Sequence, residues 1–326
     1  MAAARVLITS HTFRQVAGDH ESRLRAADCE LIGSPYARPA TEEELLPLVR
    51  DVDAVIASTD AFTRRVFESA ERLRIVARFG VGYDAIDLAA ATEHGVWITT
   101  TPGTNEQSVA DLTLGLILAL VRRIVPAVEQ TRAGRWERPI GLELSELTLG
   151  LIGFGRIGRQ VAARARAFGM QVIVYDVLRD ERAAAEAGAR YVTLDDLLAQ
   201  ADVVSLHAPA TPQTHHLIDA RALARMKPQA YLVNTARGEL VNETDLAAAL
   251  HAGRLAGAAL DVFAHEPPGP DHPLLALPNV LPTPHMAGIT VQSGRRMASM
   301  VVDDVLAVLR GERPPHALNE PVPRPR

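Results

Sequence analysis

The chain has 326 residues, of which 48% are hydrophobic and 22% are charged, the balance of a globular protein with a large core. At about 150 residues per domain, this length predicts two domains. The net charge of −5 argues against a nucleic-acid or anionic-membrane surface, and the single cysteine excludes an intrachain disulfide. Residues 1–10 hold no apolar run of signal-peptide length, and no apolar stretch is long enough to cross a bilayer. We therefore expect a cytoplasmic protein that binds neither nucleic acid nor membrane.

The first hundred residues alternate short aliphatic runs with segments rich in Ala, Glu, Leu and Arg. This alternation is typical of parallel strands that are joined by crossover helices. The predicted strands are residues 5–10, 29–34, 53–58, 74–80 and 96–101.

A second alternating series begins near Leu147 and predicts six more strands, with helices such as 157–169 and 243–252 between them. Six strands with crossovers indicate a doubly wound, dinucleotide-binding sheet, so the expected fold class is α/β with two doubly wound parallel sheets. The strands are residues 148–153, 171–176, 202–208, 230–237, 256–263 and 279–282.

Two further helices are predicted to run between the two domains. Residues 105–123 are mostly apolar, so we expect this helix to be covered on more than one side, with one face in a subunit contact. Residues 291–311 are expected to cross back to the first domain. The predicted domains are 1–101 plus 290–326 and 102–289, and residues 321–326 are expected to form a mobile tail.

A glycine-rich segment, Gly153-Phe154-Gly155-Arg156-Ile157-Gly158, matches the pattern G-x-G-x-x-G. The pattern alone is weak and also fits an ordinary strand-to-helix turn, but here it follows a predicted strand and precedes a predicted helix. Gly153 permits a tight turn, Gly155 lets a pyrophosphate approach the backbone, and Gly158 lets the helix pack against the strand.

An acidic residue, Asp176, ends the next predicted strand. Its carboxylate is placed to accept hydrogen bonds from the ribose hydroxyls of NAD and to repel the 2′-phosphate of NADP. Arg179 lies close by in the sequence and weakens this preference.

Three polar residues, Arg237, Glu266 and His285, follow predicted strands of the second series. The carboxyl ends of parallel strands line the ligand crevice of such a sheet. An arginine there can hold a carboxylate, and a histidine oriented by a glutamate can donate a proton to a carbonyl oxygen that is being reduced. Each of the three residues alone is more often a surface or structural residue than a catalytic one.

With these residues and further segments in order, the chain resembles the NAD-dependent D-2-hydroxyacid dehydrogenases, and among them is most similar to the D-3-phosphoglycerate dehydrogenases. The resemblance extends from about Leu73 to Gly311. Because the chain ends soon after Gly311, we expect no C-terminal regulatory domain. The matching segments are Gly80-Val81-Gly82-Tyr83-Asp84-Ala85-Ile86-Asp87, Thr101-Pro102-Gly103, Ser108-Val109-Ala110, Gly134-Arg135-Trp136-Glu137-Arg138, Gly155-Arg156-Ile157-Gly158, His207-Ala208-Pro209, Asn234-Thr235-Ala236-Arg237-Gly238, Leu260-Asp261-Val262-Phe263, Glu266-Pro267-Pro268 and Pro284-His285.

The resemblance implies a Rossmann NAD-binding domain inserted in a flavodoxin-like substrate domain, a 2-hydroxy or 2-oxo acid substrate, a homodimer and no metal. Arg237 would bind the substrate carboxylate and keto oxygen, and His285 would exchange the proton with Glu266 as its partner. Asp261 would hold the nicotinamide carboxamide. The substrate loop would consist of Arg78, Phe79, Gly80 and Val81, with Arg78 a candidate for a substrate phosphate. The cofactor groove would be lined by Thr101, Gly153, Gly155, Arg156, Ile157, Gly158, Asp176, His207, Ala208, Thr235, Ala236, Asp261 and Gly288.

Two alternatives remain open at this point. One is the reduction of glyoxylate or hydroxypyruvate, whose substrates differ from phosphoglycerate derivatives by the phosphate. The other is a non-catalytic role like that of the C-terminal-binding-protein corepressors, which keep the Arg–Glu–His set and use NAD as a conformational sensor.

Overall fold

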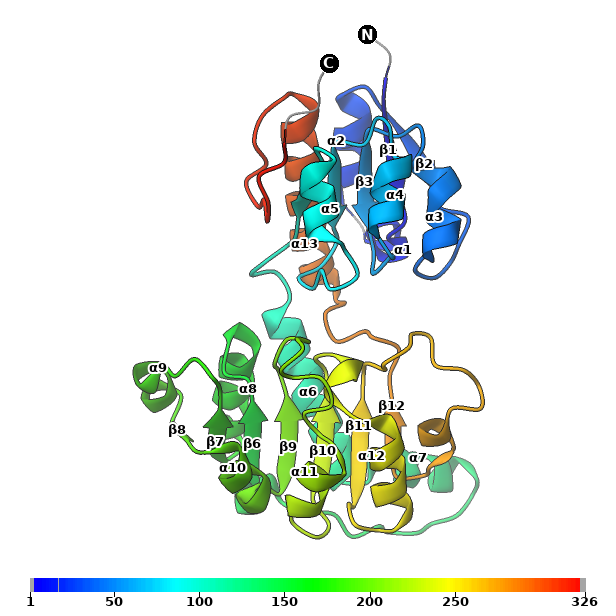
Figure 1. Ribbon diagram of the computed structural model, residues 1–326. Coiled ribbons are helices and arrows are strands. Elements are labelled where there is room, and N and C mark those ends of the chain that lie inside the picture. Colours follow the sequence, from blue (N-terminus) through cyan, green and yellow to red (C-terminus); the bar gives the residue numbers. More distant parts are fainter. Residues whose placement is uncertain (1–2, 17, 323–326) are drawn as a thin grey trace. The chain divides into compact units, whose positions relative to one another are not determined.

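The computed structural model describes residues 3–16 and 18–322, and the chain divides into two compact units (Figure 1). We call Met1–Asn105 with Ile289–Arg326 the terminal unit, and Glu106–Gly288 the central unit. Each unit is a parallel β-sheet with helices on both faces, which confirms the predicted α/β fold class.

The terminal unit contains a five-stranded sheet in the order β2-β1-β3-β4-β5, with every pair parallel. This order is that of flavodoxin-like doubly wound sheets. The strands are β1 (Ala4–Ile8), β2 (Cys29–Gly33), β3 (Ala54–Ala57), β4 (Ile75–Arg78) and β5 (Trp97–Thr99).

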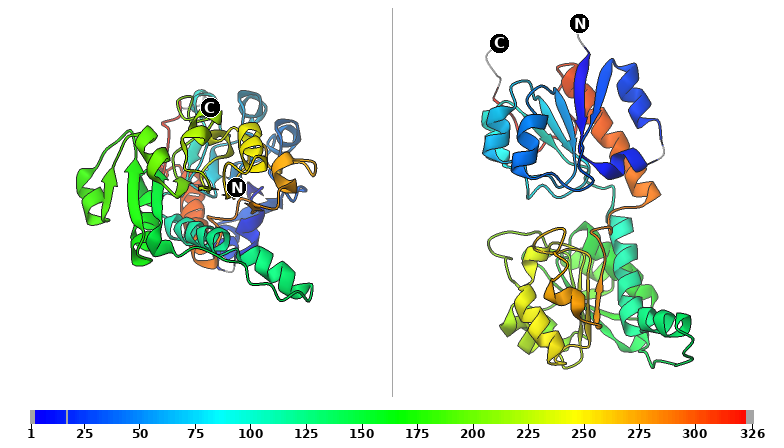
Figure 2. Two further views of the ribbon diagram at one scale, coloured as in Figure 1. Left: turned by 90° about the horizontal axis from the view of Figure 1, so that it is seen from below. Right: turned by 90° about the vertical axis from the view of Figure 1, so that its right-hand side faces the viewer.

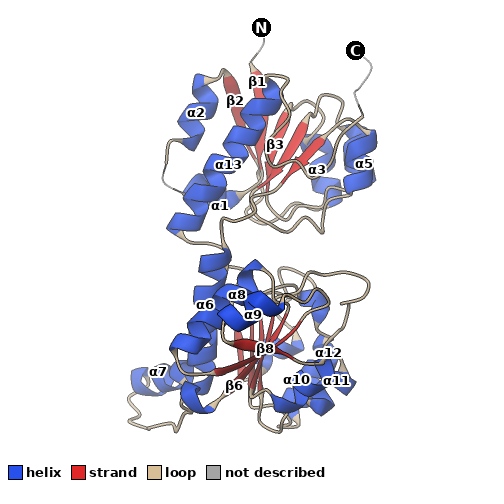
Figure 3. Ribbon diagram, turned by 90° about the vertical axis from the view of Figure 1, so that its left-hand side faces the viewer, coloured by secondary structure: helices blue, strands red, loops and turns tan. Residues whose placement is uncertain are grey.

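Helices cover both faces of this sheet because its strands are apolar on both sides. In β1, Leu7 packs on one face, whereas Val6 and Ile8 pack on the other, as the two-residue period of a strand requires. The first face carries α3 (Glu42–Leu48), α4 (Arg64–Ser69) and α5 (Leu88–Glu93). The second face carries α1 (His11–Gln15), α2 (His20–Ala26) and α13 (Val291–Leu309), as Figure 3 shows. The chain thus returns to its first sheet after the central unit has been completed.

The central unit contains a seven-stranded parallel sheet in the order β12-β11-β10-β9-β6-β7-β8. Strand order reverses beside β6, as in a Rossmann sheet. The strands are β6 (Thr148–Ile152), β7 (Gln171–Tyr175), β8 (Ala189–Tyr191), β9 (Val203–Leu206), β10 (Tyr231–Asn234), β11 (Gly257–Leu260) and β12 (Val280–Pro282).

The prediction of six strands for this sheet was wrong, because it missed β8. This edge strand has three residues, and its central residue Arg190 is exposed, so it shows no apolar run. It is recruited by β7, which offers a free edge for pairing.

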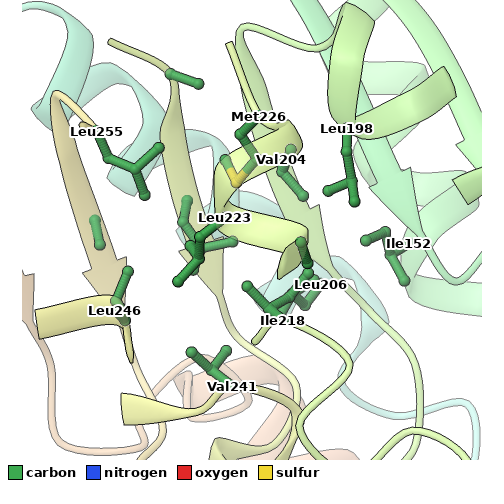
Figure 4. Close-up of a cluster of buried hydrophobic side chains, with 14 of the residues drawn as sticks. Ile152, Leu198, Val204, Leu206, Ile218, Leu223, Met226, Val241, Leu246 and Leu255 are labelled. Carbon is green, nitrogen blue, oxygen red and sulfur yellow. The ribbon is translucent and has the colours of Figure 1, made fainter. Parts of the chain in front are cut away.

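One face of the central sheet packs against α6 (Glu106–Val121) and α8 (Arg156–Ala167), and α9 (Glu181–Glu186) contributes Ala184 to the same cluster. The other face packs against α10 (Leu194–Gln200), α11 (Ala220–Arg225) and α12 (Glu243–His251). Figure 4 shows this second cluster, where Leu198, Leu223 and Leu246 meet strand residues such as Ile152 and Leu206. Three short 3₁₀ helices complete the unit: η1 (Leu144–Glu146), η2 (Gly238–Leu240) and η3 (Pro273–Ala276).

A helix that the sequence did not predict, α7 (Ile124–Arg132), follows α6 and stands off the rest of the central unit (Figure 2). Arg123 separates the two helices by adopting a left-handed conformation, with φ of +53°. No residue of α7 is buried.

Two expectations concern the whole chain. Among the described residues, no helix combines the length and apolar character needed to cross a membrane. Of the tail predicted to be mobile, residues 323–326 lie outside the described part, whereas the Val322 amide donates a hydrogen bond to the Thr92 carbonyl (3.0 Å).

Candidate functional site

The glycine turn after β6 leaves open space above the start of α8. Gly153 has φ of +98°, and a side chain there would lie about 2.6 Å from the His207 carbonyl carbon. A side chain at Gly158 would clash with the Gly153 carbonyl oxygen, so this helix packs closely on its strand. At Gly155, the N-cap of α8, no atom lies within 4 Å of the position a Cβ would take. The backbone amides of Arg156 and Ile157 begin the helix here, which is the arrangement that binds a phosphate.

Asp176 follows β7 and lies beside the same turn. Its carboxylate accepts hydrogen bonds from the Phe154 amide (2.7 Å) and the Leu178 amide (2.9 Å). A carboxylate has about four acceptor positions, so two remain for ribose hydroxyls. Arg179, the cation that lies close to Asp176 in the sequence, forms an ion pair with Glu181 (3.0 Å). Its guanidinium also lies over the ring of Tyr191.

His207 follows β9, across the strand-order reversal from the glycine turn. Its Nε2 lies 2.9 Å from the Ser205 hydroxyl, and its Nδ1 is buried without a hydrogen-bond partner. Burial lowers the pKa of His207 to about 3, so the ring is neutral near pH 7. An unpartnered buried nitrogen beside the Gly153 turn is the kind of group that a bound ligand satisfies.

The site has the features that a bound dinucleotide requires. The open position at Gly155, the uncapped start of α8, the free acceptor positions of Asp176 and the orphaned His207 nitrogen all match what a pyrophosphate, a ribose and a neighbouring polar group require. On the same edge, the Thr235 hydroxyl lies 3.0 Å from that of Thr113 on α6. The residues present therefore fit NAD.

Arg237 follows β10, and its backbone is held by the side chain of Asn234, which was not among the predicted site residues. The Nδ2 group of Asn234 donates to the Arg237 carbonyl (2.8 Å), and its Oδ1 accepts from the Ala236 amide (3.0 Å). Asn234 is 1% exposed, so both bonds are shielded from water. The Arg237 guanidinium donates to the Ala236 carbonyl (2.7 Å). The signal in the sequence was an asparagine at the end of a strand, ahead of a turn.

Glu266 and His285 form a hydrogen-bonded pair. The Nδ1 atom of His285 lies 2.6 Å from the Glu266 Oε2 atom. The other carboxylate oxygen accepts from the Phe263 amide (3.1 Å). Because the acceptor-only carboxylate faces Nδ1, Nδ1 carries a hydrogen and Nε2 is left to exchange a proton with a substrate.

The loop that carries His285 is fastened by Asp261. His285 has φ of +50°, a conformation that costs a non-glycine residue about 1–2 kcal/mol. Its amide donates to the Asp261 carbonyl (2.8 Å), and the Asp261 carboxylate accepts from the Thr283 hydroxyl and the amides of Met286 and Ala287 (2.5, 2.9 and 2.8 Å). Three of about four acceptor positions are thus used inside the protein, and one is left for the expected nicotinamide carboxamide.

Thr101 and the predicted substrate loop, residues 78–81, lie in the terminal unit. The Thr101 amide donates to the Gly80 carbonyl (2.9 Å), which joins the ends of β4 and β5, and the Thr101 hydroxyl is buried without a partner. The resemblance also implies that backbone amides of residues 78–82 bind the substrate carboxylate. The Phe79 and Gly80 amides donate to the Ala57 and Arg78 carbonyls (2.8 Å each), and the Val81 and Gly82 amides are further candidates. The predicted cofactor residues other than Thr101 lie in the central unit, with Gly288 at its end.

Candidate metal ligands were compared only among the described residues. Within residues 3–16 and 18–322, no group of three or more His, Cys, Asp or Glu residues is arranged to hold a metal ion.

The lowered pKa of His207 makes stability depend on pH. Between its ordinary value of 6.5 and about 3, the unfolded chain binds a proton that the folded chain does not, so stability falls as the pH drops through this window. The slope for one such proton is about 1.4 kcal/mol per pH unit. We expect His207→Gln to reduce the loss of stability between pH 6.5 and about pH 4, measured by urea unfolding. The exposed His251 gives the control His251→Gln, and equal slopes for His207→Gln and wild type would contradict the prediction.

Comparison with known proteins places this chain in a family. Residues 114–287 match the family described as D-isomer specific 2-hydroxyacid dehydrogenase, NAD binding domain. A glyoxylate reductase of Korarchaeum cryptofilum is 43% identical over 291 residues, which cover 87% of this chain and 88% of the relative. A D-3-phosphoglycerate dehydrogenase of Methanocaldococcus jannaschii is 44% identical over 306 residues, which cover 93% of this chain and 58% of the relative.

Among solved structures, a D-lactate dehydrogenase of Aquifex aeolicus, complexed with NAD and lactic acid, superposes with a TM-score of 0.83 at 30% identity. The match covers 94% of this chain and 96% of that one. The chain therefore belongs to the D-isomer specific 2-hydroxyacid dehydrogenases, NAD-dependent oxidoreductases that interconvert 2-hydroxy and 2-oxo acids.

Proposed function

We propose that this enzyme reduces a small, unphosphorylated 2-oxo acid such as glyoxylate or hydroxypyruvate. The observation that carries the proposal is the hydrogen bond of 2.6 Å between His285 and Glu266, which leaves Nε2 of an oriented imidazole to protonate a carbonyl oxygen. Relatives named glyoxylate reductase, such as that of Korarchaeum cryptofilum, support the choice of substrate.

In the proposed mechanism, Arg237, Glu266 and His285 of the central unit each have one task. NAD, when bound in its reduced form, supplies the hydride that reduces the substrate carbon. Arg237 binds the substrate carboxylate and polarises the carbonyl, because a guanidinium offers paired donors. The protonated form of His285 gives its Nε2 proton to the carbonyl oxygen and becomes the neutral imidazole, while Glu266 holds the ring through Nδ1–H in the orientation that this transfer needs. In the reverse direction, Nε2 takes the hydroxyl proton.

The test is a steady-state comparison of glyoxylate, hydroxypyruvate, pyruvate and 3-phosphohydroxypyruvate with NADH. We expect kcat/KM to be highest for glyoxylate or hydroxypyruvate, and His285→Ala to lower kcat by about 10²-fold or more while NADH still binds. A clear preference for 3-phosphohydroxypyruvate would overturn the assigned substrate. Wild-type kcat in His285→Ala would remove His285 from the reaction, and NADH binding without turnover of any 2-oxo acid would favour a non-catalytic role.

Asp176 is proposed to set the preference for NAD over NADP. Asp176→Asn removes the negative charge but keeps an oxygen for the Phe154 amide, so the glycine turn is preserved. We expect the ratio of kcat/KM for NADH over NADPH to fall by about tenfold, which corresponds to ~1.4 kcal/mol. Glu186→Ala, which removes an exposed charge from nearby α9, serves as the control. An unchanged ratio in Asp176→Asn would mean that another residue selects the cofactor.

A homodimer is the second proposal, and its surface differs from the one that the sequence suggested. The apolar residues of α6 are mostly buried within its own unit. Instead, large apolar side chains are exposed on α7 and the segment after it: Ile124, Val125, Val128, Trp136, Ile140 and Leu142. Trp136 is 76% exposed and Ile140 is 89% exposed, and gathered apolar groups of this kind mark contact surfaces. We assign this surface to a second copy of the chain.

Light scattering after gel filtration tests the dimer. The wild-type chain is expected to have twice the mass of one chain, and Ile124→Asp combined with Val128→Asp is expected to halve that mass, because burying two carboxylates is costly. Phe168→Asp is the matched control, since Phe168 is also exposed but lies at the end of α8. A monomeric wild type, or a double variant of unchanged mass, would contradict this proposal.

A further inference from the structure

We propose that Glu243 is a positioning residue for the reaction. It holds both ends of the loop that carries Glu266. The inference rests on the proposed role of Glu266. Glu243 is the first residue of α12, and its carboxylate points to the loop formed by residues 263–272. Its side chain is largely but not fully buried, and it takes no part in the proposed mechanism.

Glu243 bonds to two residues that lie eight positions apart in the loop. Its Oε1 atom accepts from the Ala264 amide (2.9 Å), and its Oε2 atom lies 3.1 Å from Nε2 of His272. The side chains of Glu243 and His272 are each only 18% exposed, so water competes weakly for these bonds. One carboxylate therefore ties the beginning of the loop to its end.

The bond to His272 has a defined direction. Nδ1 of His272 is buried without a partner, so the bond from Nε2 to Glu243 is the ring's only hydrogen bond among the described residues. The Phe263 ring meets the imidazole edge-on, with centroids 5.5 Å apart and planes at 79°. Since the carboxylate only accepts, Nε2 carries the hydrogen.

The peptide that Glu243 holds also touches the turn of Arg237. A side chain at Gly238 would clash with the Phe263 carbonyl carbon and the Ala264 nitrogen, so the two backbones are in direct contact there. The Phe263–Ala264 peptide is thus packed between Gly238 and Glu243. This contact gives a physical reason for glycine directly after Arg237.

The preceding peptide, Val262–Phe263, connects this contact to the reacting group by hydrogen bonds. The Phe263 amide donates to Oε1 of Glu266 (3.1 Å), and Oε2 of Glu266 lies 2.6 Å from Nδ1 of His285. The two peptides share the α-carbon of Phe263, so a shift of the Phe263–Ala264 peptide also moves the Phe263 amide, and with it Glu266 and the imidazole. Proton transfer is sensitive to displacements of this kind, because the reacting atoms must be aligned at about 3 Å.

The experiment compares Glu243→Ala, Glu243→Gln and Asp245→Asn in otherwise wild-type enzyme and in Glu266→Gln enzyme. Glu243→Ala removes both acceptors, whereas Glu243→Gln keeps one oxygen. Asp245 lies in the same first turn of α12 but accepts from the Ala220 amide (2.8 Å), so Asp245→Asn is the matched control.

We expect Glu243→Ala to lower kcat by about tenfold, with Glu243→Gln in between and Asp245→Asn unchanged. In the Glu266→Gln background, Glu243→Ala should lower kcat by less than about twofold, because no carboxylate is left to be positioned. The same factor in both backgrounds would show a general structural effect and overturn the proposal.

A second measurement does not depend on turnover. Hydrogen–deuterium exchange of cofactor-free enzyme should be faster at residues 263–266 in Glu243→Ala than in wild type or Asp245→Asn. Unchanged exchange would overturn the proposal even if activity fell. If wild-type enzyme turned over no 2-oxo acid, the proposed function would fail while exchange still decided whether Glu243 holds the loop. If Glu243→Ala does not fold, Glu243→Gln carries both measurements.

Discussion

The hydrogen bond between His285 and Glu266 joins loops that follow two neighbouring strands, β11 and β12. It exists because parallel strands deliver their carboxyl ends to one edge of the sheet. It also requires that each loop be stiff, since a free carboxylate and a free imidazole would lose rotational freedom on pairing. The structure meets this requirement with one acid for each loop: the buried Asp261 holds the histidine loop, and the partly buried Glu243 holds the glutamate loop.

The two halves of the central sheet carry different groups of predicted site residues. On one side of the strand-order reversal, the glycine turn after β6 and Asp176 after β7 form a cradle for a dinucleotide. On the other side, the ends of β10, β11 and β12 carry the Arg237, Glu266 and His285 side chains. Cofactor and substrate chemistry thus meet along one edge of a single sheet, where helices on both faces keep the strands in register.

Sequence patterns predicted most of the strands because each is a short aliphatic run between turn signals. They failed for β8, whose pairing comes from its neighbour rather than from its own three residues. They also missed α7, whose apolar residues are exposed and whose pattern is not that of a core helix. The positioning role of Glu243 was not predictable, since its partners Ala264 and His272 lie 21 and 29 residues away and are brought to it by the loop geometry.

What the sequence by itself determined is the family, and it predicted the kind of chemistry: a glycine turn followed by an acid for NAD, and an Arg–Glu–His set that resembles the family's. These predictions depend on residue types and their order along the chain, which can be read without the fold. The tertiary structure alone decided which hydrogen-bonding groups are already used: the Asp261 carboxylate accepts from Thr283 and the histidine loop, and the Phe79 and Gly80 amides donate to backbone carbonyls. Hydrogen bonds between distant segments depend on angstrom-scale placement, and only the folded chain provides it.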